Sequence, residues 1–225
     1  MGAAMTPYLV HLNAMTGGLF LLAAFAIVAT RQMSACLRWF VAQSLLLTAS
    51  AAVIGIGLGS GHLTAVAVIT FLTKVVVTPW LLRRTVRREL YSRREISQVF
   101  NIPTSLLIAA ALTLLAYGVL YPVTALGVGA FAAINLPVGL AGLFLGAYTV
   151  AVRREALAQL IGLLGMENGA FLAAVSIAHD LPLIAELAAA FDVLVTALVI
   201  GLLTRRIYDR VGGTSVGLLD ALRER

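Results

Sequence analysis

The stretch that decides the fold is Leu160-Ile-Gly-Leu-Leu-Gly-Met-Glu-Asn-Gly-Ala-Phe-Leu-Ala-Ala-Val175, an apolar run with a single carboxylate, Glu167. The wider run from 156 to 178 has about the length, roughly 20 residues, that a helix needs to cross a bilayer. Glu167 would then lie near the middle of the hydrocarbon layer. A carboxylate there is costly to bury, so it marks a candidate functional site.

The composition is that of an integral membrane protein. Of the 225 residues, 61% are hydrophobic and only 12% are charged, and the mean hydropathy is +1.00. A soluble domain is nearer about half apolar and about a quarter charged. The apolar runs are too long for barrel strands and do not alternate with period two, so helices must satisfy the backbone in lipid. We therefore expect an all-α fold, a polytopic transmembrane helix bundle.

Seven apolar runs indicate about seven spans, at 8–30, 37–59, 63–82, 103–121, 124–150, 156–178 and 183–204. Arginines fill the loops after the first, third and fifth runs and the C-terminal tail, whereas the other three loops contain neither arginine nor lysine. By the positive-inside rule, this alternation places the N-terminus outside and the C-terminus in the cytoplasm. The net charge of +6 is thus a topology signal, and no nucleic acid partner is expected.

The runs divide the chain into four parts. A three-helix part with a basic cytoplasmic loop covers 1–100, the fourth helix covers 101–123, a second three-helix part covers 124–204, and a cytoplasmic tail covers 205–225. The basic loop, 83–98, could touch anionic headgroups of the lipid bilayer or receive an acidic soluble partner. Arginine is preferred to lysine and alanine is abundant, which is typical of a GC-rich prokaryotic genome. The expected location is the plasma (inner) membrane of a prokaryote.

Four ionisable residues fall inside the predicted spans: Lys74, Glu167, Glu186 and Asp192. All but Glu186, which begins the last helix, lie near the centres of their helices, where charges mark ion or proton pathways. Burial disfavours the charged form of acids and bases alike, which lets them exchange protons near neutral pH. We expect Glu167, Asp192 and Lys74 to form a proton relay, with Glu186 as an auxiliary group. In the alternative, Lys74 pairs with Glu167 or Asp192 and only locks the bundle.

Other polar residues of the spans are auxiliary candidates for the same path: Thr70, Thr78, Asn135 and Asn168. Residues four apart share a helix face, so the two threonines flank Lys74. Pro79 cannot donate a backbone hydrogen bond, which predicts an interrupted helix close to Lys74.

The glycines of the spans have a spacing that is typical of close helix packing. Gly142 with Gly146, and Gly165 with Gly169, form two small-xxx-small pairs that let helix backbones approach each other. We expect these glycines to pack helices together and leave Glu167 to face another neighbour.

No metal site is expected in this chain. Its one cysteine, Cys36, cannot form an intrachain disulfide or a cysteine-rich cluster. No spacing requires the three histidines, His11, His62 and His179, to converge on an ion. We expect hydrogen-bonded histidines at the outer membrane surface.

Three short motifs give the chain a specific resemblance. Ala42-Gln-Ser-Leu45, Thr73-Lys-Val75 and Met166-Glu-Asn-Gly169 resemble, in this order and spacing, the membrane component E of hydrogenase-4, and the similarity runs over most of the chain. The last three helices resemble the small K subunit of respiratory complex I and its counterparts in membrane-bound hydrogenases and cation antiporters. That small protein carries a carboxylate in its second and third helices. Glu167 matches the first, and Asp192 is the nearest candidate for the second.

The resemblance implies a non-catalytic membrane-arm subunit of a hydrogenase-4-like, complex I-related redox complex, whose buried charges contribute to proton or sodium translocation. Its partners would be antiporter-like and other membrane subunits. Nickel-iron and iron-sulfur centres would belong to those partners, since nothing in this chain resembles a cysteine-ligated cluster site and it would bind no cofactor itself. Two alternatives stay open, namely a purely structural scaffold subunit and a stand-alone ion-coupled transporter.

Overall fold

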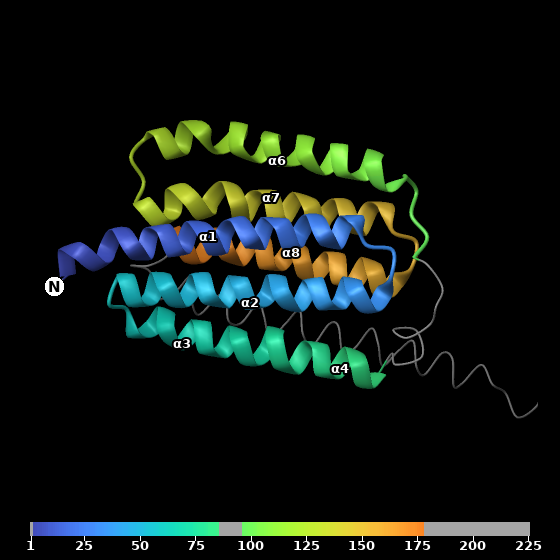
Figure 1. The fold of residues 1–225 in the computed structure, drawn as a ribbon, viewed down its shortest axis with the longest axis horizontal. Helices are drawn as coiled ribbons and strands as arrows, with labels where there is room; N and C mark the ends of the chain where they lie inside the picture. The colour runs from blue at the N-terminus through green and yellow to red at the C-terminus, as the bar shows by residue number, and fades with distance from the viewer. Residues whose placement is uncertain (1, 86–95, 178–225) are drawn as a thin grey trace, which may run out of the picture.

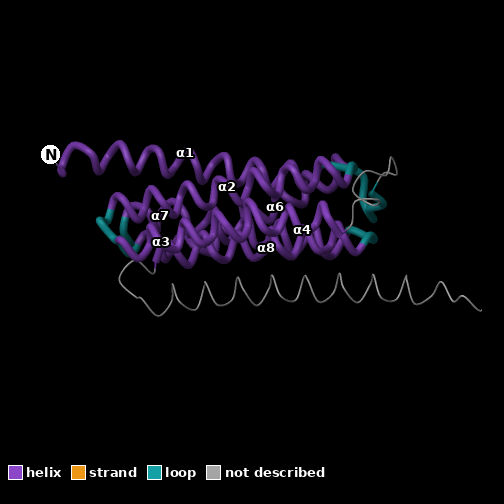
Figure 2. The backbone as a smooth tube through the Cα atoms, turned by 90° about the horizontal axis from the view of Figure 1, so that it is seen from below, coloured by secondary structure: helices purple, strands orange, loops and turns teal. Residues whose placement is uncertain are grey.

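The computed structural model describes residues 2–85 and 96–177, and within these ranges the chain is almost entirely helical. The helices are α1 (Gly2–Ala29), α2 (Met33–Gly57), α3 (Gly61–Thr70), the π-helix η1 (Phe71–Val77), α4 (Thr78–Thr85), α6 (Ile102–Ala125), α7 (Ala130–Val152) and α8 (Ala156–Ile177). They run side by side along one long axis, with the connecting loops gathered at the two ends of the bundle (Figure 2).

Six segments of the described chain are long and apolar enough to cross a membrane, as expected of a multi-pass membrane protein. They are Pro7–Ala29, Met33–Gly57, Gly61–Arg84, Ile102–Ala125, Ala130–Val152 and Leu157–Ile177. The third segment joins α3, η1 and α4 into one continuous helix. The prediction of an all-α membrane bundle is confirmed, with six of the seven spans found. The seventh predicted span, 183–204, lies outside the described residues together with Glu186 and Asp192.

The start of α6 follows directly from its sequence. Asn101 Oδ1 accepts a hydrogen bond of 2.9 Å from the backbone N–H of Thr104, which satisfies one of the free donors of the first turn. Pro103 stands in that turn, where its missing N–H has no partner to lose.

The end of α6 differs from the sequence prediction, in which the apolar runs 103–121 and 124–150 are separated at 122–123. The helix continues through Pro122 to Ala125, and the turn follows at 126–129. Pro122 lies in the last turn, where it removes a single hydrogen bond close to a helix end. Gly127 makes the turn with φ of +84°, a conformation that glycine adopts without steric cost.

The loops form two groups at opposite ends of the bundle (Figure 1). At one end α1 passes into α2, α4 ends, α6 begins, and α7 passes into α8. The described arginines of these connections are Arg31, Arg83, Arg84, Arg153 and Arg154, and this end is termed the arginine-rich end. The turns at the opposite end, 58–60 and 126–129, contain no arginine or lysine. The structure therefore gathers the arginines as the positive-inside rule requires when this end faces the cytoplasm.

The last residues of the basic loop are fastened across the arginine-rich end. Ile96 N donates to Arg31 O at 2.7 Å, next to the connection between α1 and α2. Ser97 N donates to Glu155 Oε1 at 2.7 Å, between α7 and α8. Ile96 is itself buried in an apolar cluster formed by α1, α2, α4 and α8. These contacts join the first and second halves of the chain at this end.

The backbones of α7 and α8 approach each other at glycines. A Cβ atom on Gly146 would collide with the backbone of α8, and one on Gly169 with the backbone of α7. Gly142 faces both α1 and α8, since its Cβ would lie 2.7 Å from Phe20 Cε1 and 3.3 Å from Gly169 Cα. Gly165, by contrast, faces α2, with Gln43 Oε1 3.4 Å from the position of its Cβ. Close α7–α8 packing turns the opposite side of α8 towards α2 and the third span.

Among the described spans, α8 is the most buried in the bundle and α6 is the least buried. Of the most apolar part of α8, 67% is buried inside the bundle, against 11% of that of α6. The exposed face of α6 carries large apolar side chains, among them Leu107, Leu114 and Tyr121. In Figure 1, α6 lies at the edge of the bundle, whereas α8 lies between α7 and α2 in this view. Glu167 is therefore carried by the described span that is most buried in the bundle.

The close approach of α7 and α8 predicts a specific sensitivity to one methyl group. The substitution Gly146→Ala should lower the midpoint of thermal unfolding in mild detergent, because overpacking of this kind costs about 1–3 kcal/mol. The control is Gly118→Ala in α6, where an added Cβ would have no atom within 4 Å. That variant should match or slightly exceed the wild type, since alanine favours a helix over glycine. Circular dichroism in the helix band measures both midpoints, and equal values would contradict the prediction.

Candidate functional site

Lys74 is held in an irregular turn at the middle of the third span. In η1 the backbone N–H of Thr78 donates to the carbonyl of Thr73, five residues back, and the Thr78 hydroxyl donates to the same oxygen at 2.8 Å. Pro79 follows at once and lacks the N–H of an α-helical ladder, which accounts for the π-turn before it. Thr70 and Thr78 are buried, as is Lys74. Such π-turns are frequent at functional sites.

The ammonium group of Lys74 meets two consecutive side chains of α8. Lys74 Nζ lies 3.2 Å from Glu167 Oε1 and donates a hydrogen bond of 3.0 Å to Asn168 Oδ1. It also lies 5.6 Å from the centre of the Phe171 ring, within the range of a cation–π contact. The structure thus brings together Lys74 and Glu167 from the predicted relay and Asn168 from its auxiliary residues.

Two side chains of α2 hold Asn168 in place. Asn168 Nδ2 donates to Ser44 Oγ at 3.0 Å and to Gln43 Oε1 at 3.5 Å. These bonds leave the Asn168 carbonyl oxygen turned towards Lys74. Lys74, Glu167, Asn168, Gln43 and Ser44 are all buried and are together termed the charged centre.

From the sequence, Gln43 and Ser44 were predicted only as part of the motif Ala42-Gln-Ser-Leu45. Their signal was available, because they are adjacent polar residues inside an otherwise apolar span. The helix that these two residues face could not be predicted from the sequence, because helix spacing fixes the face of a residue but not the neighbouring helix that covers this face.

Asn135 belongs to a second polar cluster, nearer the opposite end. Its side-chain amide exchanges hydrogen bonds of 3.0 and 3.1 Å with that of Asn13. The Ser50 hydroxyl donates to Asn13 Oδ1 at 2.6 Å and accepts from Asn135 Nδ2 at 3.0 Å. These three buried residues, termed the asparagine cluster, join α1, α2 and α7. Asn13 and Ser50 were missed by the sequence analysis, although each is a polar residue within an apolar run.

Arg153 was counted with the loop arginines, but it is only 2% exposed. Its Nη2 atom donates to the last carbonyls of α1 and the residue after them: Ile27 (3.0 Å), Val28 (2.9 Å) and Thr30 (2.7 Å). Carbonyls at a helix C-terminus lack intrahelical donors, so Arg153 supplies them. Burial lowers the pKa of Arg153 from its ordinary value, yet a guanidinium remains charged at neutral pH. A positive charge is therefore enclosed at the arginine-rich end.

The other predicted site residues lie outside the described chain. Glu186 and Asp192 are among them, as is most of the basic loop, 86–95. Of that loop, Arg84 is exposed and stacks over Trp80, with its guanidinium carbon 5.3 Å from the ring centre. The third member of the relay and the docking role of the loop stay predictions.

The charged centre is suited to two chemical roles. A carboxylate and an ammonium group in contact can pass a proton between them, because the neutral pair removes two charges from a low-dielectric interior. The same contacts join α2, η1 and α8, so they can also hold the bundle in one arrangement. Either role requires both partners.

Comparison with known proteins gives relatives of similar length. The chain is 35% identical over 209 residues to the uncharacterized protein Rv0085 of Mycobacterium tuberculosis, an alignment that covers 92% of this chain and 94% of the relative. It is 28% identical over 214 residues to hydrogenase-4 component E of Escherichia coli, with the same coverage of both chains. The Shigella flexneri hydrogenase-4 component E matches equally well. No family model and no solved structure matches the chain.

The buried ion pair predicts strong coupling between its two residues. Glu167→Met alone should lower the free energy of unfolding by about 3–5 kcal/mol, because it leaves the Lys74 charge without its carboxylate. The double variant Lys74→Met/Glu167→Met should recover most of that loss, since apolar residues of similar size replace the pair. Denaturation of the purified protein in detergent gives the values. Additive losses in the double variant would show that the two charges do not stabilise each other.

Two neighbouring arginines provide a second comparison. Arg153→Met should destabilise the protein by about 2–3 kcal/mol, because charge-assisted hydrogen bonds to the end of α1 are lost. Arg154→Met removes an equal charge from an exposed side chain and should change stability by less than about 0.5 kcal/mol. Thermal unfolding of both variants in the same detergent tests the difference. A larger effect at Arg154 would contradict the structural role given to Arg153.

Proposed function

The chain belongs to the family of the Mycobacterium tuberculosis protein Rv0085, and we propose that it is a non-catalytic membrane subunit of a hydrogenase-related complex. Its 28% identity to hydrogenase-4 component E, over nearly the full length of both chains, supports a place in a complex of that kind. Its specific task in this proposal is to carry protons through the charged centre.

The observation that carries the proposal is the contact of Lys74 with Glu167 deep among the helices. Glu167 lies at the midpoint of α8 (Ala156–Ile177), and Lys74 lies in the middle of the third span. Ionisable groups at this depth are rare, and they mark proton relays in pumps and transporters. The separation of 3.2 Å between Nζ and Oε1 is short enough for direct proton exchange.

The mechanism moves one proton within the pair. When Glu167 accepts a proton from the Lys74 ammonium, both groups become neutral and the desolvation cost of two buried charges disappears. A charge that changes in a neighbouring subunit shifts the balance between the ionic and neutral pairs. Glu167 then passes its proton to the next acceptor, for which Asp192 is the predicted candidate, and Lys74 is reprotonated. Asn168 keeps the lysine in place through its hydrogen bond of 3.0 Å.

The proposal assigns the remaining tasks to partner subunits. Redox centres, whether nickel-iron or iron-sulfur, belong to those subunits, because one cysteine cannot provide the thiolates of a cluster. Antiporter-like membrane subunits, related to those of complex I, would continue the proton path. The arginine-rich end faces the cytoplasm of a prokaryotic plasma membrane in this arrangement, where the basic loop, 83–98, can meet an acidic soluble partner.

A scaffold role is the second candidate, and one observation favours it. Asn168 bonds to both α2 and η1, so the charged centre joins three helices whether or not protons move. In that case the charges only fix the bundle between larger subunits. The two roles differ in what a neutral substitute for Glu167 would do.

The decisive variant is Glu167→Gln in the assembled complex. Glutamine can still accept a hydrogen bond from Lys74 but cannot carry a proton, so subunit composition should be normal and redox-driven proton uptake should fall sharply. The complex is purified through a tag on this chain and reconstituted in liposomes that contain a pH-sensitive dye. Glu155→Gln is the control, because that carboxylate binds Ser97 N at the arginine-rich end.

Each outcome separates the candidates. Normal uptake with Glu167→Gln in a normally assembled complex would overturn the relay role. Loss of both the partner subunits and the proton uptake would favour the scaffold role. Proton uptake by the purified chain without partners would instead support a stand-alone transporter.

A further inference from the structure

Residues 96–99 lie across the arginine-rich end of the bundle and are termed the latch. In Figure 1 the segment before α6 runs down this end beside the connection between α7 and α8. Two backbone hydrogen bonds of 3.1 and 3.3 Å pair the latch with residues 152–154. The pairing is antiparallel and sets Gln98 opposite Arg153. Opposite residues of such a pair project their side chains to the same face, so Gln98 and Arg153 are side-chain neighbours.

Several polar side-chain atoms are buried where the latch meets the connection between α7 and α8. Nε2 and Oε1 of Gln98, Nε and Nη1 of Arg153, and Oε2 of Glu155 have no hydrogen-bond partner within the described chain. Such atoms are rare in folded proteins, because each gives up its bonds to water and gains none in return. The closed latch therefore carries a cost that is relieved when it lifts and these atoms meet solvent.

Few interactions hold the latch shut against this cost. Ile96 is buried in the apolar cluster between α1, α2, α4 and α8, and its N–H donates to Arg31 O. The N–H of Ser97 donates to Glu155 Oε1. A segment with one buried apolar side chain and a few backbone bonds opens locally while the surrounding helices stay folded.

The charge of Arg153 is not balanced by its neighbours. Glu155 attracts the guanidinium and Arg31 repels it, and no carboxylate of the described residues forms an ion pair with it. Its Nη2 atom is committed to the carbonyls at the end of α1, whereas Nε and Nη1 keep their hydrogens for another acceptor. An anionic group is what this position lacks.

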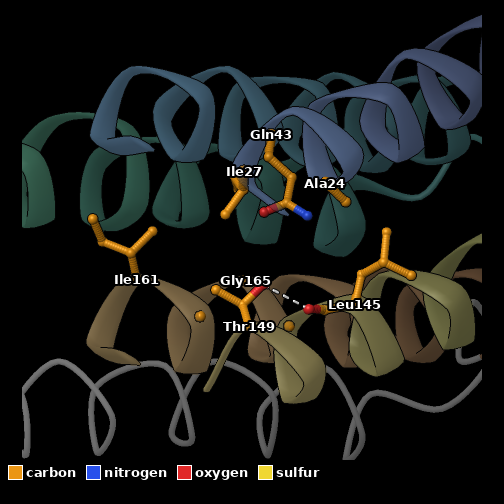
Figure 3. A pocket seen from close by; sticks show the side chains of 9 residues that line it. Ala24, Ile27, Gln43, Leu145, Thr149, Ile161 and Gly165 are labelled. Carbon is orange, nitrogen blue, oxygen red and sulfur yellow. Dashed lines mark hydrogen bonds between the residues drawn. The ribbon is translucent and has the colours of Figure 1, made fainter. Parts of the chain in front are cut away.

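The inner side of Arg153 supplies no negative charge. Its Nη2 atom binds the carbonyl of Ile27 and its backbone N–H binds that of Thr149, and both of these residues line a cavity between α1, α2, α7 and α8 (Figure 3). Gln43 and Thr149 are the polar side chains of this lining, and both are neutral. The side from which an acidic group can approach Arg153 is therefore that of the latch.

We propose that the latch opens and that an acidic side chain of a partner subunit then binds the Arg153 guanidinium. Guanidinium and carboxylate form strong, charge-assisted hydrogen bonds, and the free Nε and Nη1 donors suit a carboxylate oxygen. The latch closes the end of the bundle, so a residue that enters from the cytoplasm reaches Arg153 more directly than a lipid phosphate, whose acyl chains stay beside the helices. The partner rests on the function proposed above, whereas the latch does not.

Hydrogen–deuterium exchange of the purified chain in detergent tests the latch. Ile96→Ala should raise the exchange rate of the latch amides severalfold, because the apolar anchor is lost. Gln98→Leu should lower that rate severalfold, because two of the buried polar atoms are removed. Val99→Leu is the matched control, since the Val99 side chain is 54% exposed, and it should leave the rate unchanged. Rates are corrected for intrinsic exchange, and those in the middle of α8 should be the same in all variants. A wild-type rate in either Ile96→Ala or Gln98→Leu would overturn the latch.

The structure of the assembled complex tests the acidic partner. The complex is purified through a tag on this chain and its structure is determined by electron cryomicroscopy. A carboxylate of a partner subunit should lie within hydrogen-bond distance of Arg153 Nε or Nη1, with Gln98 displaced. Gln98 still opposite Arg153, or a lipid phosphate on the guanidinium, would overturn this assignment.

The outcomes separate this inference from the proposed function. Hydrogenase-related partner subunits together with a closed latch would overturn the carboxylate site and leave the proposed function standing. A chain that purifies without such subunits would overturn the proposed function and the carboxylate site together. The exchange rates of the purified chain decide the latch in both cases.

Discussion

An ammonium group and a carboxylate in contact, sealed among apolar helices, are the constraint on which the rest of this structure depends. Each charge alone would cost several kcal/mol to remove from water, and the contact between the two charges offsets part of that cost. The third span and α8 must therefore meet at one height, and the π-turn before Pro79 places Lys74 there. The glycines on α7 serve the same end, because they take one side of α8 and leave Glu167 to the other.

Hydropathy and arginine placement were enough to predict the architecture. Six spans appear where the apolar runs predicted them, because a lipid-spanning helix must be both long and apolar. The end of α6 was predicted too early, since proline in a final turn removes a single bond and need not stop a helix. The spacing of glycines identified residues for close packing, but Gly165 faces α2 and not α7. Periodicity fixes a face of a helix and leaves its neighbour open.

The site was predictable in kind but not in its pairing. The sequence left Glu167 and Asp192 as alternative partners of Lys74, because no rule of spacing relates residues on separate helices. Gln43 and Ser44 complete the charged centre from α2, and their part in it follows only from the fold. The burial of Arg153 was not predicted, for a related reason. In sequence it cannot be told from its exposed neighbour Arg154, yet the two side chains occupy opposite environments.

The guanidinium of Arg153 has a consequence for how the molecule holds together. It ends α7 but completes α1, so one side chain from the latter half of the chain finishes a helix of the first hairpin. Without those carbonyls, the buried Arg153 guanidinium would lose the acceptors of its Nη2 atom. The connection between α7 and α8 therefore depends on α1 to solvate its charge, and this contact ties the second half of the described chain to the first.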